Sequence, residues 1–166
     1  FFASAYSSKA GGVLIYVSLD FLAKIVVSDF GDIVNGWIQY VFLKGKLGNL
    51  SLTNLHSEPK KSQSIRKQQL QLVRRKVTSF ATTTNLIGGD FNFVLGLEDR
   101  INTLDGKLCG ERCQLSDFWD SNFNDFTKLY QGHFTRASKP SHATHIASRI
   151  DRLYADLPLE AYALLH

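Results

Sequence analysis

Hydrophobic residues recur along the chain with two different periods, and each period predicts one kind of element. Short runs rich in β-branched and aromatic residues, bounded by glycine or polar residues, predict strands. These runs lie at Val13–Val17, Lys24–Phe30, Trp37–Leu43, Leu47–Leu55 and Ser148–Tyr154. Because the third and fourth runs are separated only by Lys44-Gly45-Lys46, we expect them to form a β-hairpin.

A helical period follows the hairpin. Pro59 is typical of a first helical turn, and apolar residues recur three and four positions apart between Leu70 and Phe80. A second helix is expected over Arg112–Phe126, and the stretch Gly96–Gly110 is expected to be a polar loop. Strands mixed with a few helices, including one clear hairpin, predict layers of α and β with a mixed or antiparallel sheet.

The first helical segment also carries a basic face. We interpret this face as the solvated side of an amphipathic helix, with contact to a nucleic-acid backbone as the alternative. Its residues are Lys60, Lys61, Arg66, Lys67, Arg74, Arg75 and Lys76.

The composition is that of an ordinary globular domain. The chain has 166 residues, of which 44% are hydrophobic and 20% charged, and its formal net charge of +4 permits a polyanionic partner without requiring one. No apolar run approaches the roughly 18 residues of a membrane helix. Two cysteines, Cys109 and Cys113, are too few for a disulfide framework, so we expect a reducing, intracellular compartment. The sequence contains no methionine and begins with Phe1, and we therefore interpret it as a piece of a longer polypeptide.

The strongest local signal is Gly88-Gly89-Asp90-Phe91-Asn92, where an apolar strand is predicted to run into a tight glycine turn. Glycines allow the backbone to approach a ligand closely, because they add no side-chain bulk. On extended backbone Asp90 and Asn92 would point to the same side, offering a base or metal ligand and an amide donor for an anionic oxygen. The alternative is a strand-to-turn junction in which both side chains serve the backbone, and the spacing alone favours this alternative.

A second signal is the segment Ser148–Tyr154, in which Asp151 lies between two arginines. Alternation places Arg149, Asp151 and Leu153 on one face of a strand, where Asp151 could orient a catalytic imidazole. The alternative is a surface salt bridge. Between the two signals, Glu98-Asp99-Arg100 is expected to fix a loop by internal salt bridging.

Taken in order, G-D-F-N, E-D-R and S-R-I-D-R-L-Y resemble the endonuclease/exonuclease/phosphatase superfamily, and more narrowly the endonuclease domain of LINE-type retrotransposons. The resemblance spans about Gly11 to Tyr154. It implies a DNase I-like four-layer α/β sandwich with two mixed or antiparallel sheets, of which residues 1–166 would be an incomplete part. It also implies DNA as partner, a reverse transcriptase domain downstream in the parent chain, and the nucleus as the site of action.

The resemblance further implies metal-assisted phosphodiester hydrolysis with Mg²⁺ or Mn²⁺. Asp90 would orient or deprotonate the attacking water and be a weak metal ligand, and Asn92 would help to hold the phosphate. Asp151 would pair with a histidine that contacts the scissile phosphate. His56, which stands where the family often has a tyrosine, is a weaker fourth candidate, since an imidazole can also donate to a phosphate.

The sequence departs from the family pattern at both ends. The family's main metal carboxylate precedes the Gly-Gly-Val strand, and only residues 1–10 precede it here, without an acidic residue. The final catalytic histidine comes well after the S-R-I-D strand, and His166 stands too early to be that residue. We therefore expect little or no activity from residues 1–166 alone. The alternatives are a phosphatase or phosphodiesterase of the same superfamily, and a decayed, non-catalytic remnant that binds nucleic acid.

Overall fold

The computed structural model describes residues 2–4, 12–46, 48–80, 82–131, 134, 136–137 and 145–157. No helix in these ranges is long and apolar enough to cross a membrane. The elements before the first long helix are β1 (Phe2–Ser4), β2 (Val13–Ile15), α1 (Leu19–Leu22), β3 (Ile25–Val34), β4 (Ile38–Gly45) and β5 (Gly48–His56). They are followed by α2 (Gln63–Thr78), β6 (Thr83–Asp90), a 3₁₀ turn (Leu97–Asp99), β7 (Arg100–Asn102), α3 (Gln114–Asn122), β8 (Thr127–Gln131), β9 (Arg136–Ala137), β10 (Ile146–Ser148) and β11 (Asp151–Ala155).

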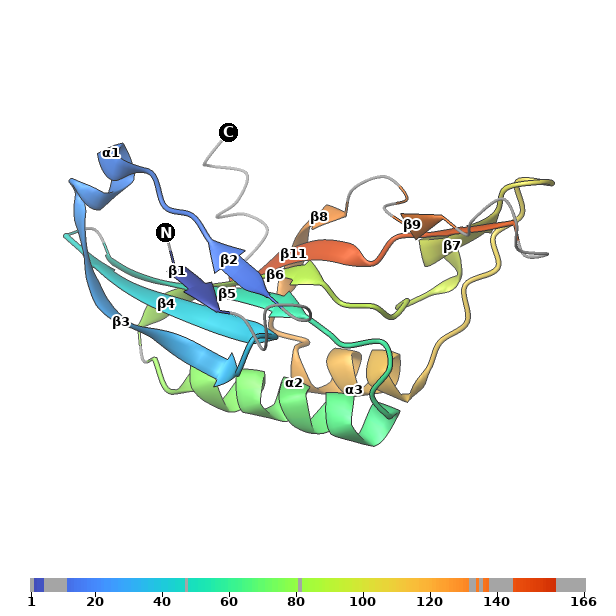
Figure 1. Ribbon diagram of the computed structural model, residues 1–166, viewed down its shortest axis with the longest axis horizontal. Coiled ribbons are helices and arrows are strands. Elements are labelled where there is room, and N and C mark those ends of the chain that lie inside the picture. Colours follow the sequence, from blue (N-terminus) through green and yellow to red (C-terminus); the bar gives the residue numbers. More distant parts are fainter. Residues whose placement is uncertain are drawn as a thin grey trace.

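A mixed sheet of six strands, in the order β3-β4-β5-β6-β11-β8, forms the centre of the molecule (Figure 1). The strands β5 and β6 are parallel, and the other neighbours are antiparallel. Parallel neighbours need a crossover connection, and α2 supplies it. The mixed sheet and the predicted β4–β5 hairpin are confirmed, with Gly45 opposite Gly48 at the turn.

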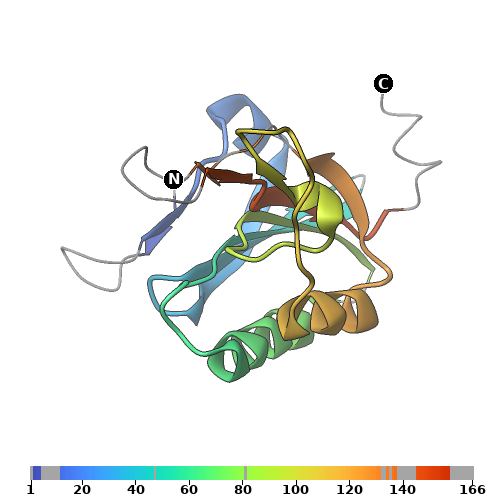
Figure 2. The ribbon, with the colours of Figure 1, turned by 90° about the vertical axis from the view of Figure 1, so that its right-hand side faces the viewer.

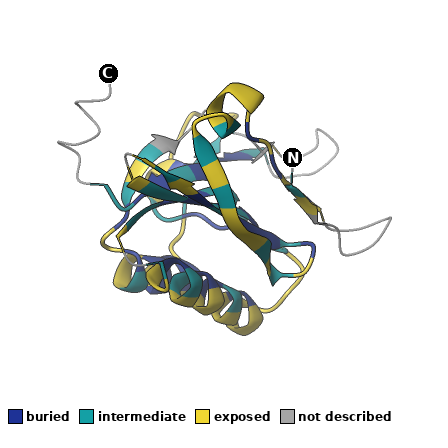
Figure 3. Cartoon of the chain, turned by 90° about the vertical axis from the view of Figure 1, so that its left-hand side faces the viewer, coloured by how far each residue is buried: buried dark blue, intermediate teal, exposed yellow. Residues whose placement is uncertain are grey.

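Both long helices lie on the same face of this sheet (Figures 1 and 2). The side of each helix that faces the sheet is buried and the outer side is exposed, as Figure 3 shows. The main core fills the space between the helices and the sheet. Its members include Leu70, Val73 and Val77 of α2, Leu115, Phe118 and Trp119 of α3, and Ile38, Leu55, Ile87 and Tyr154 of the strands.

On the opposite face, β1 and β2 pair into a small antiparallel sheet that packs against β4 and β5. A second, smaller core lies there, formed by Ile15, Val17, Val41 and Leu43. The strands β7, β10 and β9 form a third sheet, which extends from one end of the large sheet (Figure 1). The α/β class is thus confirmed, and the four-layer arrangement with two large sheets stays a prediction.

Several predicted boundaries are corrected. The first long helix begins at Gln63 rather than at Pro59, because the Ser62 hydroxyl caps it by accepting the Ile65 N–H. The segment 96–110 contains a 3₁₀ turn and β7 and is not wholly loop. The expected last strand is two strands, β10 and β11, with Arg149 and Ile150 between them.

Candidate active site

The end of β5, the end of β6 and the beginning of β11 meet at one edge of the large sheet. There His56 is the register partner of Asp90 across the parallel pair, and Asp151 is the partner of Asp90 across the antiparallel pair. Register partners share a face, and the Cβ atoms of antiparallel partners lie about 4.5–5.5 Å apart. All three side chains are partly exposed. The fold therefore brings three of the four candidate residues into one polar row, although they are far apart in the sequence.

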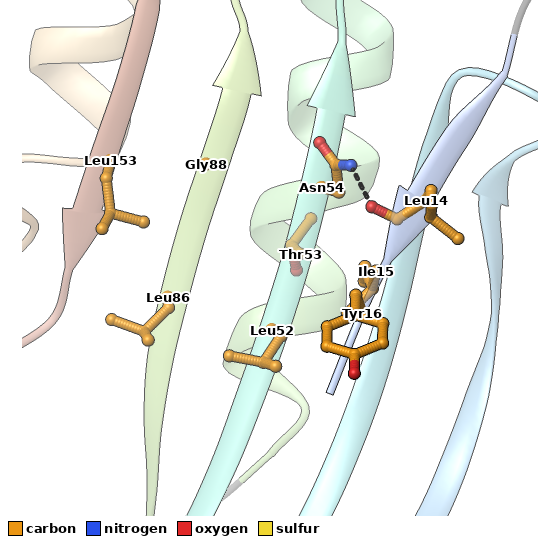
Figure 4. Close-up of a pocket in the computed structure, with 9 residues that line it drawn as sticks. All are labelled: Leu14, Ile15, Tyr16, Leu52, Thr53, Asn54, Leu86, Gly88 and Leu153. Atoms are coloured by element: carbon orange, nitrogen blue, oxygen red, sulfur yellow. Dashed lines mark hydrogen bonds between the residues drawn. The ribbon is translucent and has the colours of Figure 1, made fainter. Parts of the chain in front are cut away.

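This row lies on the face opposite the helices. Residues two apart in a strand share a face, so Asn54, Gly88 and Leu153 form the next row along the same side. Figure 4 shows these residues lining a shallow hollow of about 260 Å³ between β2 and β11. The Asn54 amide donates to the Leu14 carbonyl oxygen at 2.8 Å, which ties β2 to β5 directly beside the polar row.

The fourth candidate, Asn92, is placed differently from the prediction. It lies beyond the end of β6 with a φ of 51°, in the left-handed region, so it does not continue the extended backbone of Asp90. An Asp90 carboxylate oxygen accepts the Asn92 N–H at 2.8 Å, and the Asn92 side-chain amide donates to the Ser57 carbonyl at 2.9 Å. Both side chains thus serve the backbone, as the alternative held. The same bonds keep the Asn92 amide between the ends of β5 and β6.

The two glycines lie inside β6 and do not form a tight turn. At Gly89, where φ is +130°, an added Cβ would collide with the Leu55 carbonyl oxygen of β5 and approach the Asn54 side chain. The close approach that glycine permits is therefore made to the neighbouring strand, and the prediction of a close approach to a ligand is corrected on this point.

A buried arginine, which was predicted to lie on the solvated face of its helix, supports this site. Arg66 of α2 is 8% exposed, and its Nε donates to the Ser57 hydroxyl at 2.8 Å. Its Nη2 donates to the carbonyl oxygens of Phe91 and Asn92, each at 3.0 Å. Burial lowers the pKa of Arg66 from its ordinary value, and the neighbouring Cys113 and Asp90 oppose that shift electrostatically.

The sequence held a signal for this role. Arg66 is four residues before Leu70, which puts it on the same helical stripe as Leu70, Val73 and Val77. All four residues are buried. The interpretation of Arg66 as solvated was wrong because it followed the charge of the side chain and not its position in the period.

A second buried arginine, Arg152 of β11, binds the segment that follows β6 from the side opposite Arg66. The Arg152 and Asp99 side chains are 0% and 1% exposed and form an ion pair at 2.9 Å. Arg152 also donates to the Phe93 carbonyl at 2.7 Å, and Asp99 accepts the Leu95 N–H at 2.7 Å. The salt bridge at Glu98-Asp99-Arg100 was expected to be internal to the segment, and this expectation is corrected: Asp99 pairs with Arg152 of β11, and the Arg100 Nε donates to the Ser148 hydroxyl at 3.2 Å.

Comparison with known proteins identifies the family. The chain matches the endonuclease/exonuclease/phosphatase family over residues 1–164. It belongs to that family. No curated protein sequence matches the chain.

Two solved structures share the endonuclease/exonuclease/phosphatase fold with this chain. The endonuclease domain of TRAS1, a telomere-specific non-LTR retrotransposon, is similar with a TM-score of 0.56 and 17% identity, over 78% of this chain and 55% of that one. The mannosyl-6-phosphatase Bt3783 of Bacteroides thetaiotaomicron VPI-5482 is similar with a TM-score of 0.51 and 18% identity, over 80% of this chain and 53% of that one. At these identities the likeness shows the fold alone. The chain spans about half the length of both structures.

Enzymes of the endonuclease/exonuclease/phosphatase family typically use divalent metals, which raises the question of whether the polar row fits Mg²⁺. Among the described residues no three His, Cys, Asp or Glu side chains form a group that could hold a metal ion. The row does offer the Asp90 and Asp151 carboxylates on adjacent strands. Because Mg²⁺ is commonly held by one or two carboxylates together with waters and substrate phosphate, the donor type fits this ion. His166 lies outside the described residues.

Proposed function

We propose that this chain carries the central part of a metal-dependent phosphodiesterase site, and that the site nicks DNA for a LINE-like retroelement. The observation that supports the proposal best is the strand register that aligns His56, Asp90 and Asp151 at one sheet edge. An acid or base, a metal carboxylate and a donor to phosphate are the groups that hydrolysis of an anionic ester requires.

Each residue has a role in this proposal. The Asp90 carboxylate orients or deprotonates the attacking water, while the Asn92 amide and the His56 imidazole donate to oxygens of the phosphate. Asp151 accepts a hydrogen bond from a second imidazole, which contacts the scissile phosphate. A Mg²⁺ or Mn²⁺ ion held by Asp90, with Asp151 as its neighbour, would stabilise the negative charge that develops on the phosphoryl group.

The part of the fold on the open face of the sheet also belongs to the proposal. Leu52, Leu86 and Leu153 line the hollow of Figure 4 on that face. We propose that a second large sheet covers these residues in a longer polypeptide, completing a four-layer sandwich. Because this chain spans about half of the matched structures, full activity is proposed for that polypeptide, with a reverse transcriptase domain downstream and the nucleus as the site of action.

A phosphatase is the second candidate, because a mannosyl-6-phosphatase shares the fold with a TM-score of 0.51. The order of the G-D-F-N, E-D-R and S-R-I-D-R segments favours the endonuclease. The two candidates differ in the ester that is cleaved, since a phosphatase releases inorganic phosphate from a monoester, whereas an endonuclease hydrolyses a diester and opens a circular plasmid.

Metal binding by the 166-residue chain provides a test that does not depend on turnover. We expect Asp90→Asn and Asp151→Asn to weaken Mn²⁺ binding, measured by electron paramagnetic resonance, about ten-fold or more. Glu111→Gln, which removes an exposed carboxylate away from the row, is the matched control and should leave binding unchanged. Equal Mn²⁺ affinities in all four proteins would contradict the proposed metal site.

Nicking of supercoiled plasmid in Mg²⁺ by the full-length polypeptide tests the reaction. Asp90→Asn should reduce nicking about a hundred-fold or more, because the base that activates water is lost. Phosphate release from a sugar monophosphate without nicking would favour the phosphatase. DNA binding without cleavage of the plasmid or of the sugar monophosphate would favour a non-catalytic remnant.

A further inference from the structure

A pocket of about 520 Å³ lies next to the polar row, between the β3–β4 turn and the segment that precedes α2. His56 belongs both to the row and to the lining of this pocket. The volume lies within the range of small-molecule sites, about 300–1,000 Å³, and is sufficient for one nucleotide. Whatever binds in the pocket is therefore a direct neighbour of a group bound at the row.

An aromatic side chain forms one wall of the pocket. Trp37 is partly exposed, and the centroid of its ring system lies 5.0 Å from that of the His56 ring, with the planes at 58°. Its backbone is fixed on both sides, since its N–H donates to the Val34 carbonyl at 2.9 Å and its carbonyl accepts the His56 N–H at 2.8 Å. A rigidly placed, partly exposed indole is suited to stacking on a flat ligand.

The rim of the pocket is charged. Lys60 and Lys61 are exposed, and the only ion pair that either of them makes among the described residues is a loose one, between Lys61 and Glu58 at 3.8 Å. A pair at that distance on the surface contributes little, so both ammonium groups can bind a phosphate. The Glu58 side chain is 18% exposed and provides carboxylate acceptors, which can bind the N–H groups of a nucleobase.

Indole, ammonium groups and carboxylate together match a nucleotide better than a bare phosphate. The lysines alone would be enough to bind the backbone of a duplex, but the exposed part of the Trp37 indole, which contacts the His56 ring on one side, would then contact no base. Stacking requires a base that is not enclosed in a helix, as in single strands.

We propose that this pocket binds one unpaired nucleotide of the substrate strand, with its base stacked on Trp37 and its phosphate beside Lys60 and Lys61. The inference rests on the proposed function and deepens it. It specifies a polynucleotide with a locally unpaired residue next to the phosphate to which His56 and Asn92 would donate.

Tryptophan fluorescence can report this binding directly. The chain has two tryptophans, and Trp119 is only 3% exposed within the core, so quenching by an oligonucleotide reports Trp37. The probes are a single-stranded thymidine decamer and an abasic decamer of equal length and charge, titrated in EDTA. We expect the thymidine decamer to quench the emission and to bind about ten-fold more tightly than the abasic decamer.

Variants separate stacking from charge. Trp37→Leu, followed by fluorescence anisotropy of labelled decamers, should remove the preference for the thymidine decamer, while Trp37→Phe should keep most of it. Lys60→Ala with Lys61→Ala should weaken both decamers equally and lower the slope of log affinity against log salt by about 0.7 for each phosphate that is no longer neutralised. Lys24→Ala is the control and should change neither property, because this exposed lysine precedes the first residue of β3, whereas the pocket lies at the other end of that strand.

Equal binding of the two decamers by the wild type, or a preference that survives Trp37→Leu, would overturn the inference. Because Trp37 also packs against the core, circular dichroism must first show that the variant is folded. If it is not, the wild type decides, because equal affinities for the two decamers, or no quenching by the thymidine decamer, would overturn the inference. Failure here leaves the Mn²⁺ and nicking tests of Asp90 unaffected, and Asp90→Asn should retain the preference for the thymidine decamer.

Discussion

Substitution of Arg66 by methionine is the sharpest test of how the candidate active site is held. Methionine has a similar length and no donor, so it keeps much of the packing against the apolar stripe of α2 while removing three hydrogen bonds. These bonds join α2 to the Ser57 hydroxyl at the end of β5 and to the Phe91 and Asn92 carbonyls that follow β6. The loss is therefore concentrated where the strands that carry His56 and Asp90 end.

The expected cost follows from the number and type of these bonds. Hydrogen bonds from a charged donor contribute about 1.5–3 kcal/mol each, which sets an upper limit of about 4.5–9 kcal/mol for three. Relief of the arginine's burial and new contacts of the carbonyls with water offset much of this sum. We therefore expect a loss of about 3 kcal/mol in the free energy of unfolding. In a domain of this size that loss lowers the melting temperature by about 6–12 °C.

Urea denaturation and thermal unfolding followed by circular dichroism measure this cost, with Arg75→Met as the matched control. Arg75 is exposed on the same helix, so its replacement should change stability by less than about 0.5 kcal/mol. Hydrogen exchange adds a local measure, because the Ser57 N–H donates to the Asp90 carbonyl and the Asn92 N–H to the Asp90 side chain. Equal stabilities of the two variants, with unchanged exchange at these amides, would refute the assigned role.

Two further predictions concern the same edge of the sheet. In urea denaturation, Gly89→Ala should lower the free energy of unfolding by more than about 3 kcal/mol, because the added Cβ would collide with the Leu55 backbone. Gly106→Ala is the control and should cost about 1 kcal/mol, since Gly106 has open space around it and a φ of +71°. Similar losses in the two variants would contradict the close approach of β5 and β6 at Gly89. Asp99→Asn should lower the free energy of unfolding by about 3 kcal/mol, because it leaves the buried Arg152 charge without its partner. The double variant with Arg152→Met should recover part of this loss, and the absence of any recovery would argue against the pair.

The elements that the sequence predicts well are those that depend on neighbouring residues. The β4–β5 hairpin and the apolar stripe of α2 were predictable, because a short turn and a helical period are both local patterns. Which residues would meet was less accessible. The alignment of His56 with Asp90 and Asp151 depends on the strand order β5-β6-β11, and long-range pairing leaves no signal in the period of a single strand. It was the family resemblance, and not the hydrophobic pattern, that predicted a common site for these residues.

The two errors at the Gly88–Asn92 segment have one physical origin. A glycine pair indicates that another group comes close, but it does not tell whether that group is a ligand or the next strand, and here it is the Leu55 carbonyl of β5. In the same way, the two-residue spacing of Asp90 and Asn92 implies a shared face only if the backbone stays extended. The left-handed φ of Asn92 removes that condition.

The loop after Asp90 also explains why Arg66 and Arg152 are buried. The strand β6 ends at Asp90, so the backbone of Phe91 and Phe93 lies outside the sheet, while their side chains belong to the main core. The carbonyls of Phe91, Asn92 and Phe93 then have to be satisfied by groups outside a strand ladder. Arg66 binds the first two from the α2 side, and Arg152 binds the third from β11. Because a guanidinium presents several donors in a fixed plane, each arginine can bind a backbone carbonyl and a second group at once. Substitution of either Arg66 or Arg152 should therefore make the segment Phe91–Phe93 less ordered and shift Asn92. If each arginine acted only on its nearest carbonyl, the two substitutions would not have this effect in common.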